Sequence, residues 1–189
     1  MEEEIKLNLG CGPRNFGQSW DHIDGGSYPH LKSRDIFNLP YEDESVSLIY
    51  SSHVIEYFDR DEIKTLLTEW KRVLKQGGHL RLAVPDFSNM CALYCNDALE
   101  LKDVLGPLYG KMLMGDETIY HKTVYDFKSL KGVLDTMEFD EIARYDWRKT
   151  EHSDFDDHSQ AYIPHMDKQH GTSISLNVQC KKRHIMNKR

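Results

Sequence analysis

The N-terminal stretch Ile5-Lys-Leu-Asn-Leu-Gly-Cys-Gly-Pro13 joins an apolar segment directly to a glycine turn. A second strand-like run, residues 20–24, ends at Asp24. Gly10 and Gly12 let the backbone turn tightly and approach a ligand, because glycine has no Cβ. A carboxylate at the end of a second strand can accept hydrogen bonds from ribose hydroxyls. This order predicts the first half of a nucleotide-type cleft in a Rossmann-like, doubly wound α/β fold.

The spacing of this motif restricts the ligand. A dinucleotide fingerprint has a third glycine and an acid roughly 20 residues further on. Here Asn15 stands at the third glycine position, and Asp24 follows Gly12 by only twelve residues. A pyrophosphate is usually bound at the N-terminus of a full helix, for which this connection is too short. The motif therefore favours a cofactor without phosphates.

Further motifs follow in the order and spacing of a known family. They are Leu7-Asn-Leu-Gly-Cys-Gly12 with Asp24, Arg34-Asp-Ile-Phe-Asn-Leu-Pro-Tyr41, Ser47-Leu-Ile-Tyr-Ser-Ser-His-Val-Ile-Glu56, and Trp70-Lys-Arg-Val-Leu-Lys-Gln-Gly-Gly-His-Leu-Arg-Leu82. With these motifs, residues 5–86 resemble a class I S-adenosylmethionine-dependent methyltransferase. The resemblance implies a mostly parallel seven-stranded sheet with a C-terminal antiparallel hairpin and a helical insertion as lid. It also implies S-adenosylmethionine as cofactor and S-adenosylhomocysteine as product.

The hydrophobic pattern predicts the elements of one domain over residues 1–180. Apolar residues at helical spacing predict a helix over 61–75, ended by Gly77-Gly78, and a second over 126–137. Residues 87–125 are expected to form the insertion, 146–171 a long loop, and 181–189 a basic tail. Strands are expected at 5–10, 20–24, 46–51, 79–84, 139–145 and 172–180, with a short one ending near 35–36.

The resemblance implies which residues hold the cofactor. Asp24 would bind the ribose, and Asp35 with Ile36 would border the adenine. The remaining cofactor-binding residues lie on the glycine loop and just after the fourth strand: Leu9, Gly10, Cys11, Gly12, Ser51 and Ser52.

The acceptor site is expected where the insertion meets the sheet. His121 and His53 are the candidate bases, since an imidazole can take a proton at neutral pH. Aromatic rings of the insertion could orient the acceptor or simply pack the lid on the sheet. Arg148, on the long loop, could meet a phosphate or carboxylate. The predicted substrate-binding residues are Tyr109, Tyr120, Tyr125 and Arg148.

The histidines and aspartates of residues 152–158 show no metal-ligand spacing, so a solvated loop without metal is expected there. Cys91 and Cys95 lie one helical turn apart and favour core packing over a metal pair. No metal site is predicted.

Composition bounds the partners and the compartment. Twenty-four basic and 31 acidic residues give a net charge of −7, which disfavours a nucleic-acid partner. The sequence has no secretory-signal pattern, no apolar run that approaches a membrane span of roughly 18 residues, and no Cys-x-x-Cys pair. A cytoplasmic protein with reduced thiols and a small-molecule acceptor is expected, and a homodimer stays open.

Three functions remain open. The first is N-methylation of a phosphoethanolamine-type amine, as in the small bacterial methyltransferases of surface-polysaccharide and phosphoethanolamine type that the chain resembles. The second is O-methylation of a sugar or sugar nucleotide in capsule or lipopolysaccharide biosynthesis. The third is a non-catalytic partner protein that binds S-adenosylmethionine.

Overall fold

The computed structural model describes residues 4–165 and 167–184. Its centre is a seven-stranded sheet with the strand order β3-β2-β1-β4-β5-β11-β8. The first five strands of that order are parallel, and β11 is antiparallel to both β5 and β8. The strands are β1 (Ile5–Leu9), β2 (Asp21–Ile23), β3 (Leu31–Ser33), β4 (Val46–Ser52), β5 (Leu74–Pro85), β8 (Phe139–Arg144) and β11 (Ser175–Lys182). The predicted mostly parallel sheet with an antiparallel C-terminal pair is confirmed.

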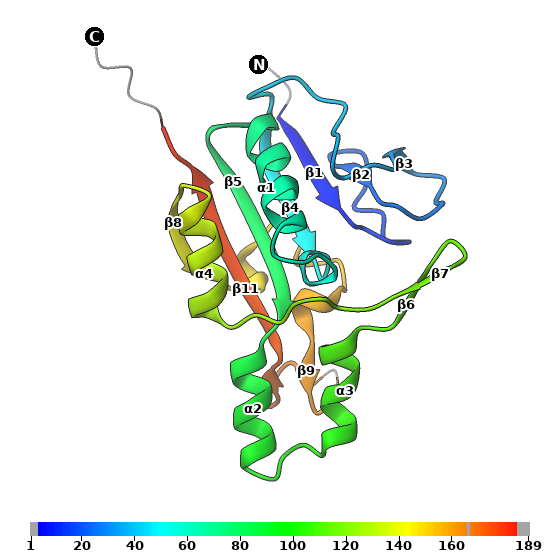
Figure 1. Cartoon of the computed structure of the whole chain (residues 1–189), viewed down its shortest axis with the longest axis vertical. Helices are drawn as coiled ribbons and strands as arrows, with labels where there is room; N and C mark the ends of the chain where they lie inside the picture. The colour runs from blue at the N-terminus through cyan, green and yellow to red at the C-terminus, as the bar shows by residue number, and fades with distance from the viewer. Residues whose placement is uncertain (1–3, 166, 185–189) are drawn as a thin grey trace.

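Two helices cover one face of the sheet (Figure 1): α1 (Glu62–Val73) and α4 (Phe127–Thr136). The apolar side of α1 is buried at the positions that the periodicity predicts, including Leu66, Leu67 and Trp70. Asp59 lies two residues before the N-cap residue Asp61, and its carboxylate accepts hydrogen bonds from the amides of Asp61 and Glu62 at 2.9 Å each. Burial of these side chains in one continuous core holds the helices on the sheet.

The first helix ends earlier than predicted. Its C-cap is Leu74, and β5 begins at the same residue, so Gly77 and Gly78 lie inside a strand. The pairing of β5 with β4 shifts register between Val46 and Leu48, and Gly77 has φ +74°. The two glycines therefore lie in an irregularity of the strand, where β5 advances five residues, from Leu74 to His79, while β4 advances two.

The opposite face of the sheet is covered by the segment 146–171 instead of helices. The connections 10–20, 24–30 and 34–45 contain no helix, although parallel strands are usually joined by one. Phe155 stacks on Phe16 with ring centroids 4.4 Å apart, and Phe16 packs with Trp20 and Tyr50 of the sheet face. The predicted solvated loop is thus a structural layer. It contains η2 (Trp147–Lys149), η3 (His158–Gln160) and β9 (Tyr162–Ile163), and β9 pairs with β10 (Thr172–Ser173).

The insertion after β5 is partly helical and partly a hairpin. It contains α2 (Phe87–Cys95), α3 (Leu101–Tyr109), and the antiparallel strands β6 (Met112–Met114) and β7 (Glu117–Ile119). In Figure 1 the helices extend beyond the carboxyl ends of the parallel strands, and the hairpin lies beside them. Cys95 on α2 is exposed and Cys91 is half-buried, so the prediction that both pack in the core is wrong.

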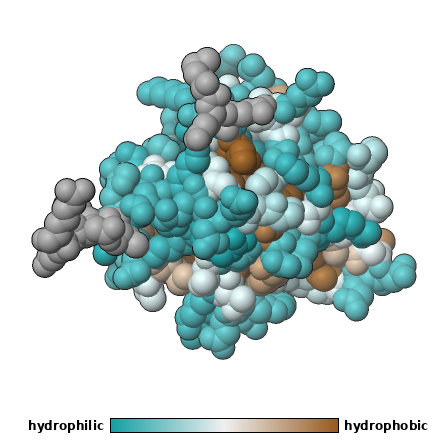
Figure 2. All heavy atoms as spheres, turned by 90° about the horizontal axis from the view of Figure 1, so that it is seen from above, coloured by the Kyte–Doolittle hydropathy of each residue, from teal (hydrophilic) through white to brown (hydrophobic). Residues whose placement is uncertain are grey.

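The two ends of the molecule differ in surface character. Figure 2, which looks down on the end opposite α2 and α3, shows a mostly hydrophilic face. The exposed large apolar side chains belong instead to the insertion, among them Leu101, Leu113 and Tyr120. Strand β11 continues to the buried Lys182, two residues beyond the predicted domain boundary, and residues 185–189 of the expected tail lie outside the described part.

Candidate active site

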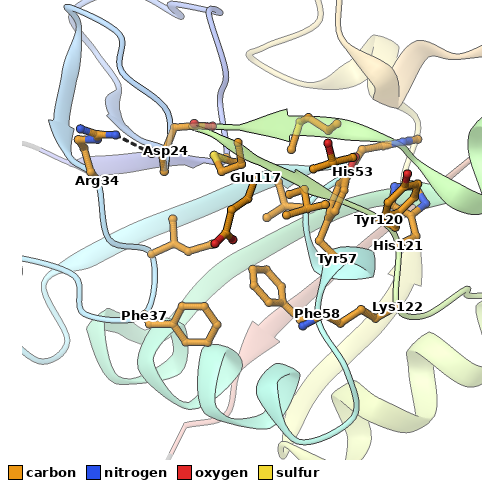
Figure 3. A pocket seen from close by; sticks show the side chains of 18 of the residues that line it. Asp24, Arg34, Phe37, His53, Tyr57, Phe58, Glu117, Tyr120, His121 and Lys122 are labelled. Carbon is orange, nitrogen blue, oxygen red and sulfur yellow. Dashed lines mark hydrogen bonds between the residues drawn. The ribbon is translucent and has the colours of Figure 1, made fainter.

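A cavity of about 690 Å³ lies at the carboxyl edge of the parallel strands. Ligands of open α/β sheets bind at this edge, and the size is typical of small-molecule sites. Figure 3 shows Asp24 and Arg34 near one end of the cavity, and His53, Tyr120 and His121 toward the other. The carboxylate of Glu117, from β7, lies between these two ends.

The glycine turn and Asp24 form the first wall. Gly10 and Gly12 both have positive φ, +70° and +57°, which explains why glycine stands at both positions. The Gly12 amide donates to Oδ2 of Asp24 at 2.8 Å, and the Gly26 amide donates to Oδ1 at 2.7 Å. Each carboxylate oxygen keeps a second lone pair for a ligand hydroxyl.

Space is open above the turn. A Cβ added at Gly12 would have no heavy atom within 4 Å, whereas one added at Gly10 would be 2.1 Å from Cγ2 of Val54. Val54 follows His53 at the end of β4 and also lines the cavity. The turn therefore offers a ligand bare backbone at Gly12 and an apolar contact at Val54.

The β6–β7 hairpin forms the outer wall. Met112 and Met114 line the cavity together with residues 117–122, whereas no residue of α2 or α3 does. A Cβ on Gly25 would be 3.3 Å from Sδ of Met114, so the hairpin touches the loop after β2. The part of the insertion that covers the cavity is thus the hairpin and not the helices. A two-residue connection, Gly115-Asp116, joins the two short strands. Such a connection with glycine is a sequence pattern typical of a β-hairpin.

The predicted cofactor residues fall into two groups. Gly10, Asp24, Asp35 and Ile36 line the cavity. The other five residues do not line it: Leu9, Cys11, Gly12, Ser51 and Ser52. Leu9, Cys11 and Ser51 are buried below the wall, and Ser51 Oγ donates to the Leu9 carbonyl at 3.0 Å. These residues support the turn, and Ser52 Oγ is buried without a hydrogen-bond partner in the described residues.

Three predicted substrate residues lie away from the cavity. Tyr109 ends α3 with its side chain exposed, because the chain turns back at Gly110 before the hairpin begins. Tyr125 is buried beside a separate groove between α1 and α4. Arg148 packs over the rings of Trp147 and Tyr162 and donates to the Lys168 carbonyl at 2.7 Å. These three side chains therefore do not line the cavity, whereas that of Tyr120 does.

Both predicted histidines line the cavity and are neutral at pH 7. Burial lowers the pKa of His53 well below its usual range, and burial also lowers the pKa of His121. His121 is held by its backbone amide, which donates to the Tyr109 carbonyl at 2.9 Å, and by Nδ1, which lies 3.0 Å from the Pro107 carbonyl. Its ring packs edge-on against Tyr57, with centroids 4.5 Å apart.

Glu56 is the residue of this region that the sequence pattern did not single out. It lies in η1 (Ile55–Tyr57) and is 1% exposed, although glutamate is rarely fully buried unless paired. Oε1 is 3.6 Å from Nδ1 of His53 and 3.8 Å from Nε2 of His121. Burial raises the pKa of Glu56 to about 8. From the sequence alone this glutamate resembles an ordinary helix-start residue.

Within the described residues, no group of three or more His, Cys, Asp or Glu side chains is arranged to hold a metal ion. In the same residues, no helix is both long and apolar enough to cross a membrane.

Comparison with protein families finds one match, over residues 13–82, to the model described as a methyltransferase domain. This match and the cavity at the carboxyl edge of the sheet indicate a methyltransferase. A comparison with curated proteins finds no match.

Solved methyltransferases share the fold at low sequence identity. A Methanosarcina mazei S-adenosylmethionine-dependent methyltransferase is 16% identical, with 98% of this chain and 95% of that chain covered and a TM-score of 0.56. One from Archaeoglobus fulgidus is 13% identical, with 96% and 87% covered and a TM-score of 0.57. The Burkholderia thailandensis 1,6-didemethyltoxoflavin-N1-methyltransferase, solved with its substrate and S-adenosylhomocysteine, is 11% identical, with 95% and 71% covered and a TM-score of 0.55.

The residues of the cavity fit S-adenosylmethionine, the cofactor that the match to a methyltransferase domain implies. Asp24 offers carboxylate lone pairs, Asp35 and Ile36 form an edge for a base, and open backbone lies at Gly12. This cofactor supplies an electrophilic methyl group on a sulfonium. The protein then has to hold an acceptor in line with that group, exclude water and take up a proton.

Proposed function

We propose that this methyltransferase acts on a small-molecule acceptor, and that the acceptor is an amine. The observation that carries the proposal is that the Glu117 carboxylate and the rings of Tyr57, Phe58 and Tyr120 line the same cavity (Figure 3). A carboxylate and aromatic faces are the groups that attract an ammonium ion. The cavity volume of about 690 Å³ is typical of sites for small molecules.

An amine with a phosphate, of the phosphoethanolamine type, is the leading acceptor. Arg148 is not available to bind the phosphate group of such an acceptor, because it packs against Trp147 and Lys168 outside the cavity. The basic side chain at the acceptor end is that of Lys122, whose Nζ bonds Glu62 at 2.8 and 2.9 Å. A phosphate would have to draw Lys122 from this exposed ion pair, which is worth little in water.

A second acceptor class is favoured by a separate observation. His53 and Glu56 place a buried base beside the cavity. A hydroxyl needs such a base more than an amine does, because a neutral amine attacks before it loses its proton. O-methylation of a sugar or sugar nucleotide is therefore the alternative.

The cofactor is tested first, by thermal unfolding with S-adenosylhomocysteine and with NAD. A ligand present at 100 times its Kd stabilises the folded protein by about 2.7 kcal/mol. We expect S-adenosylhomocysteine to raise the Tm of the wild type and NAD to leave it unchanged. Asp24→Asn should weaken the S-adenosylhomocysteine effect, whereas Asp21→Asn, outside the cavity, is the matched control. A shift with NAD alone would contradict the proposal.

The acceptor is then tested by a mass-spectrometric screen with S-adenosylmethionine. One set contains ethanolamine and phosphoethanolamine, and the other contains sugar nucleotides. Methylated amines support the leading proposal, and the ratio of the two amines measures the contribution of the phosphate. Methylated sugars alone would replace it by the alternative. Binding of S-adenosylhomocysteine without any product would favour the non-catalytic binding protein.

A further inference from the structure

The large apolar side chains that remain exposed are gathered in one part of the chain. Within the described residues, all of them lie between residues 87 and 124, in the insertion after β5. They are Phe87, Tyr94, Leu101, Leu105, Tyr109, Met112, Leu113, Tyr120 and Val124. Single exposed apolar residues are normal, but a group of them confined to one element marks an interaction surface. Figure 1 shows that α2 and α3 of this insertion protrude from the sheet.

Helix α3 is apolar on two neighbouring sides. The buried Val104 and the half-buried Leu108 pack in a small core shared with α2. Leu101, Leu105 and Tyr109 follow one another at intervals of four residues, so they form a stripe along the adjacent side of the helix. Their side chains are 59%, 43% and 59% exposed. The described part of the chain therefore leaves this stripe uncovered.

A groove runs beside the stripe. It has a volume of about 170 Å³ and lies between α2 and α3. The described residues that line it carry no charge: Phe87, Met90, Cys91, Tyr94, Leu101, Val104 and Leu108. Leu101 belongs both to the stripe and to the wall of the groove, so an apolar ridge and an apolar groove lie next to each other. Such a surface can fit a copy of itself across a two-fold axis, with each ridge at the groove of the other copy.

The charges around α3 favour a second copy over a lipid surface. Three exposed carboxylates lie at or just before the start of the helix: Asp97, Glu100 and Asp103. One base, Lys102, lies among them and pairs with Glu100 at 2.7 Å. The exposed Lys111 lies just beyond the other end of the helix. Antiparallel pairing brings the acidic start of each helix beside the basic end of the other, whereas an anionic lipid surface attracts clusters of basic residues.

We propose that two copies of this chain associate through α3, with the two helices antiparallel across a two-fold axis at Leu105. Leu105 is the middle residue of the stripe, so pairing of the whole stripe with itself brings the two Leu105 side chains together. In this register Leu101 of each copy meets Tyr109 of the other. Glu100 of each copy then lies near Lys111 of the other. The association is independent of the cofactor and of the acceptor.

The first test is the molar mass of the full chain in solution. Size-exclusion chromatography with light scattering should give the mass of two chains at micromolar concentration. Leu105→Glu brings two carboxylates together in every dimer and should weaken association by roughly a hundredfold or more. Leu113→Glu is the matched control, because it makes the same change at an exposed position of the β6–β7 hairpin, outside the stripe. It should leave the dimer intact, and a monomeric wild type would overturn the proposal.

The second test is specific for a second copy. Leu105→Lys alone should also be monomeric, because two ammonium groups then meet at the axis. An equimolar mixture of Leu105→Glu and Leu105→Lys should regain the mass of two chains, since a carboxylate then meets an ammonium group. Circular dichroism shows whether both variants keep the wild-type helix content. A mixture of two folded variants that stays monomeric would contradict the antiparallel arrangement.

A milder change keeps the register testable even if both Leu105 variants fail to fold. Lys111→Glu alters an exposed side chain and should weaken the dimer by roughly tenfold, because a carboxylate then lies near Glu100 of the other copy. Sedimentation velocity over a range of concentrations measures the Kd of the dimer. An unchanged Kd in Lys111→Glu would contradict this register.

The other possible occupants of the stripe are separated by sedimentation with vesicles of phosphatidylcholine and phosphatidylglycerol. The dimeric wild type should remain in the supernatant. A monomeric wild type that sediments with the vesicles would replace the second copy by a lipid surface. A monomeric wild type that stays in the supernatant would leave the stripe to a different protein. Either monomeric result overturns the proposal.

Discussion

Two buried carboxylates lie close to histidines in this molecule, and their surroundings differ. Asp157 is on the segment 146–171, and its carboxylate accepts from the Tyr50 hydroxyl at 2.5 Å and from the Ser159 amide at 2.8 Å. The carboxylate of Glu56, next to the cavity residues His53 and Tyr57, has no hydrogen-bond partner within the described residues. Buried polar groups normally have partners. The hydrogen bonds of Asp157 therefore indicate a structural role, whereas burial of Glu56 favours the protonated form of its carboxyl group.

The histidines of the two sites differ in the same sense. His152, near Asp157, is fully buried among the rings of Phe16, Trp20 and Tyr50. His53 lines the cavity. Both are neutral at pH 7 because of burial. Burial alone thus does not separate the two histidines, whereas the position of His53 beside the cavity does.

The largest effect that tests this comparison is on the pH dependence of stability. The folded protein holds a proton on Glu56 up to about pH 8, whereas the unfolded chain releases it near 4.5. Stability is therefore fully present below pH 4.5 and is lost as pH rises through 8, by on the order of 5 kcal/mol. Glu56→Gln should remove this loss. Urea unfolding at about pH 5 and about pH 9 measures the change in the free energy of unfolding. The same change in the wild type and in Glu56→Gln would contradict the raised pKa of Glu56.

The structural carboxylate should behave in the opposite way. Asp157→Asn replaces an acceptor of two charge-assisted hydrogen bonds with a neutral amide, and should cost roughly 4 kcal/mol of unfolding free energy at pH 7. Asp154→Asn, at an exposed position of the same segment, should stay within about 0.5 kcal/mol of the wild type. Chemical denaturation of both variants is the measurement. Equal stabilities would mean that Asp157 is not needed by this layer.

The buried histidine of that layer makes the fold sensitive to acid. Burial lowers the pKa of His152 to about 4, so the unfolded chain binds a proton near pH 6.5 that the folded protein does not. Stability is lost as pH falls below 6.5, by about 3 kcal/mol at pH 4. His152→Phe should reduce this loss, because a ring of similar shape replaces two unpaired nitrogens. Thermal unfolding at about pH 7 and about pH 4.5 tests it, with the exposed His170→Phe as control.

The smallest effect concerns the position of His121. A Cβ on Gly110, whose φ is +51°, would be 1.9 Å from Nε2 of this ring. Gly110→Ala should cost about 1–2 kcal/mol and also move His121 away from Glu56. Gly115→Ala is a matched control, because φ there is +61° and no atom lies within 4 Å. Urea unfolding of both variants measures the difference. An equal loss of stability in the two variants would contradict the contact between position 110 and His121.

Local sequence patterns predicted the elements that neighbouring residues determine. The strand before Gly10, the buried face of α1 and the position of Asp24 all follow from periodicity and glycine geometry. The helix end at Gly77-Gly78 was wrong, because strand pairing with β4 extended β5 backward to Leu74. The tendency of a glycine pair to end a helix is weak compared with the stabilisation that strand pairing in a continuous sheet provides.

Contacts between distant segments could not be predicted in this way. The burial of His152 depends on rings more than 100 residues earlier, and nothing near it in the chain signals them. Arg148 was expected at the acceptor site, but Trp147 and Tyr162 hold it elsewhere. Glu56 was missed because its partners, His53 and His121, come together only in the folded chain.

The layer made by residues 146–171 has a practical consequence for protein engineering. The region that matches the methyltransferase domain ends at residue 82, yet the ring of Phe16 beside the glycine turn stacks on Phe155, and Arg14 donates to the Asp156 carbonyl at 3.0 Å. A fragment trimmed to the matched region would expose the apolar sheet face around Tyr50 to water. Any shortened or chimeric version that is to bind ligand must therefore retain this later segment.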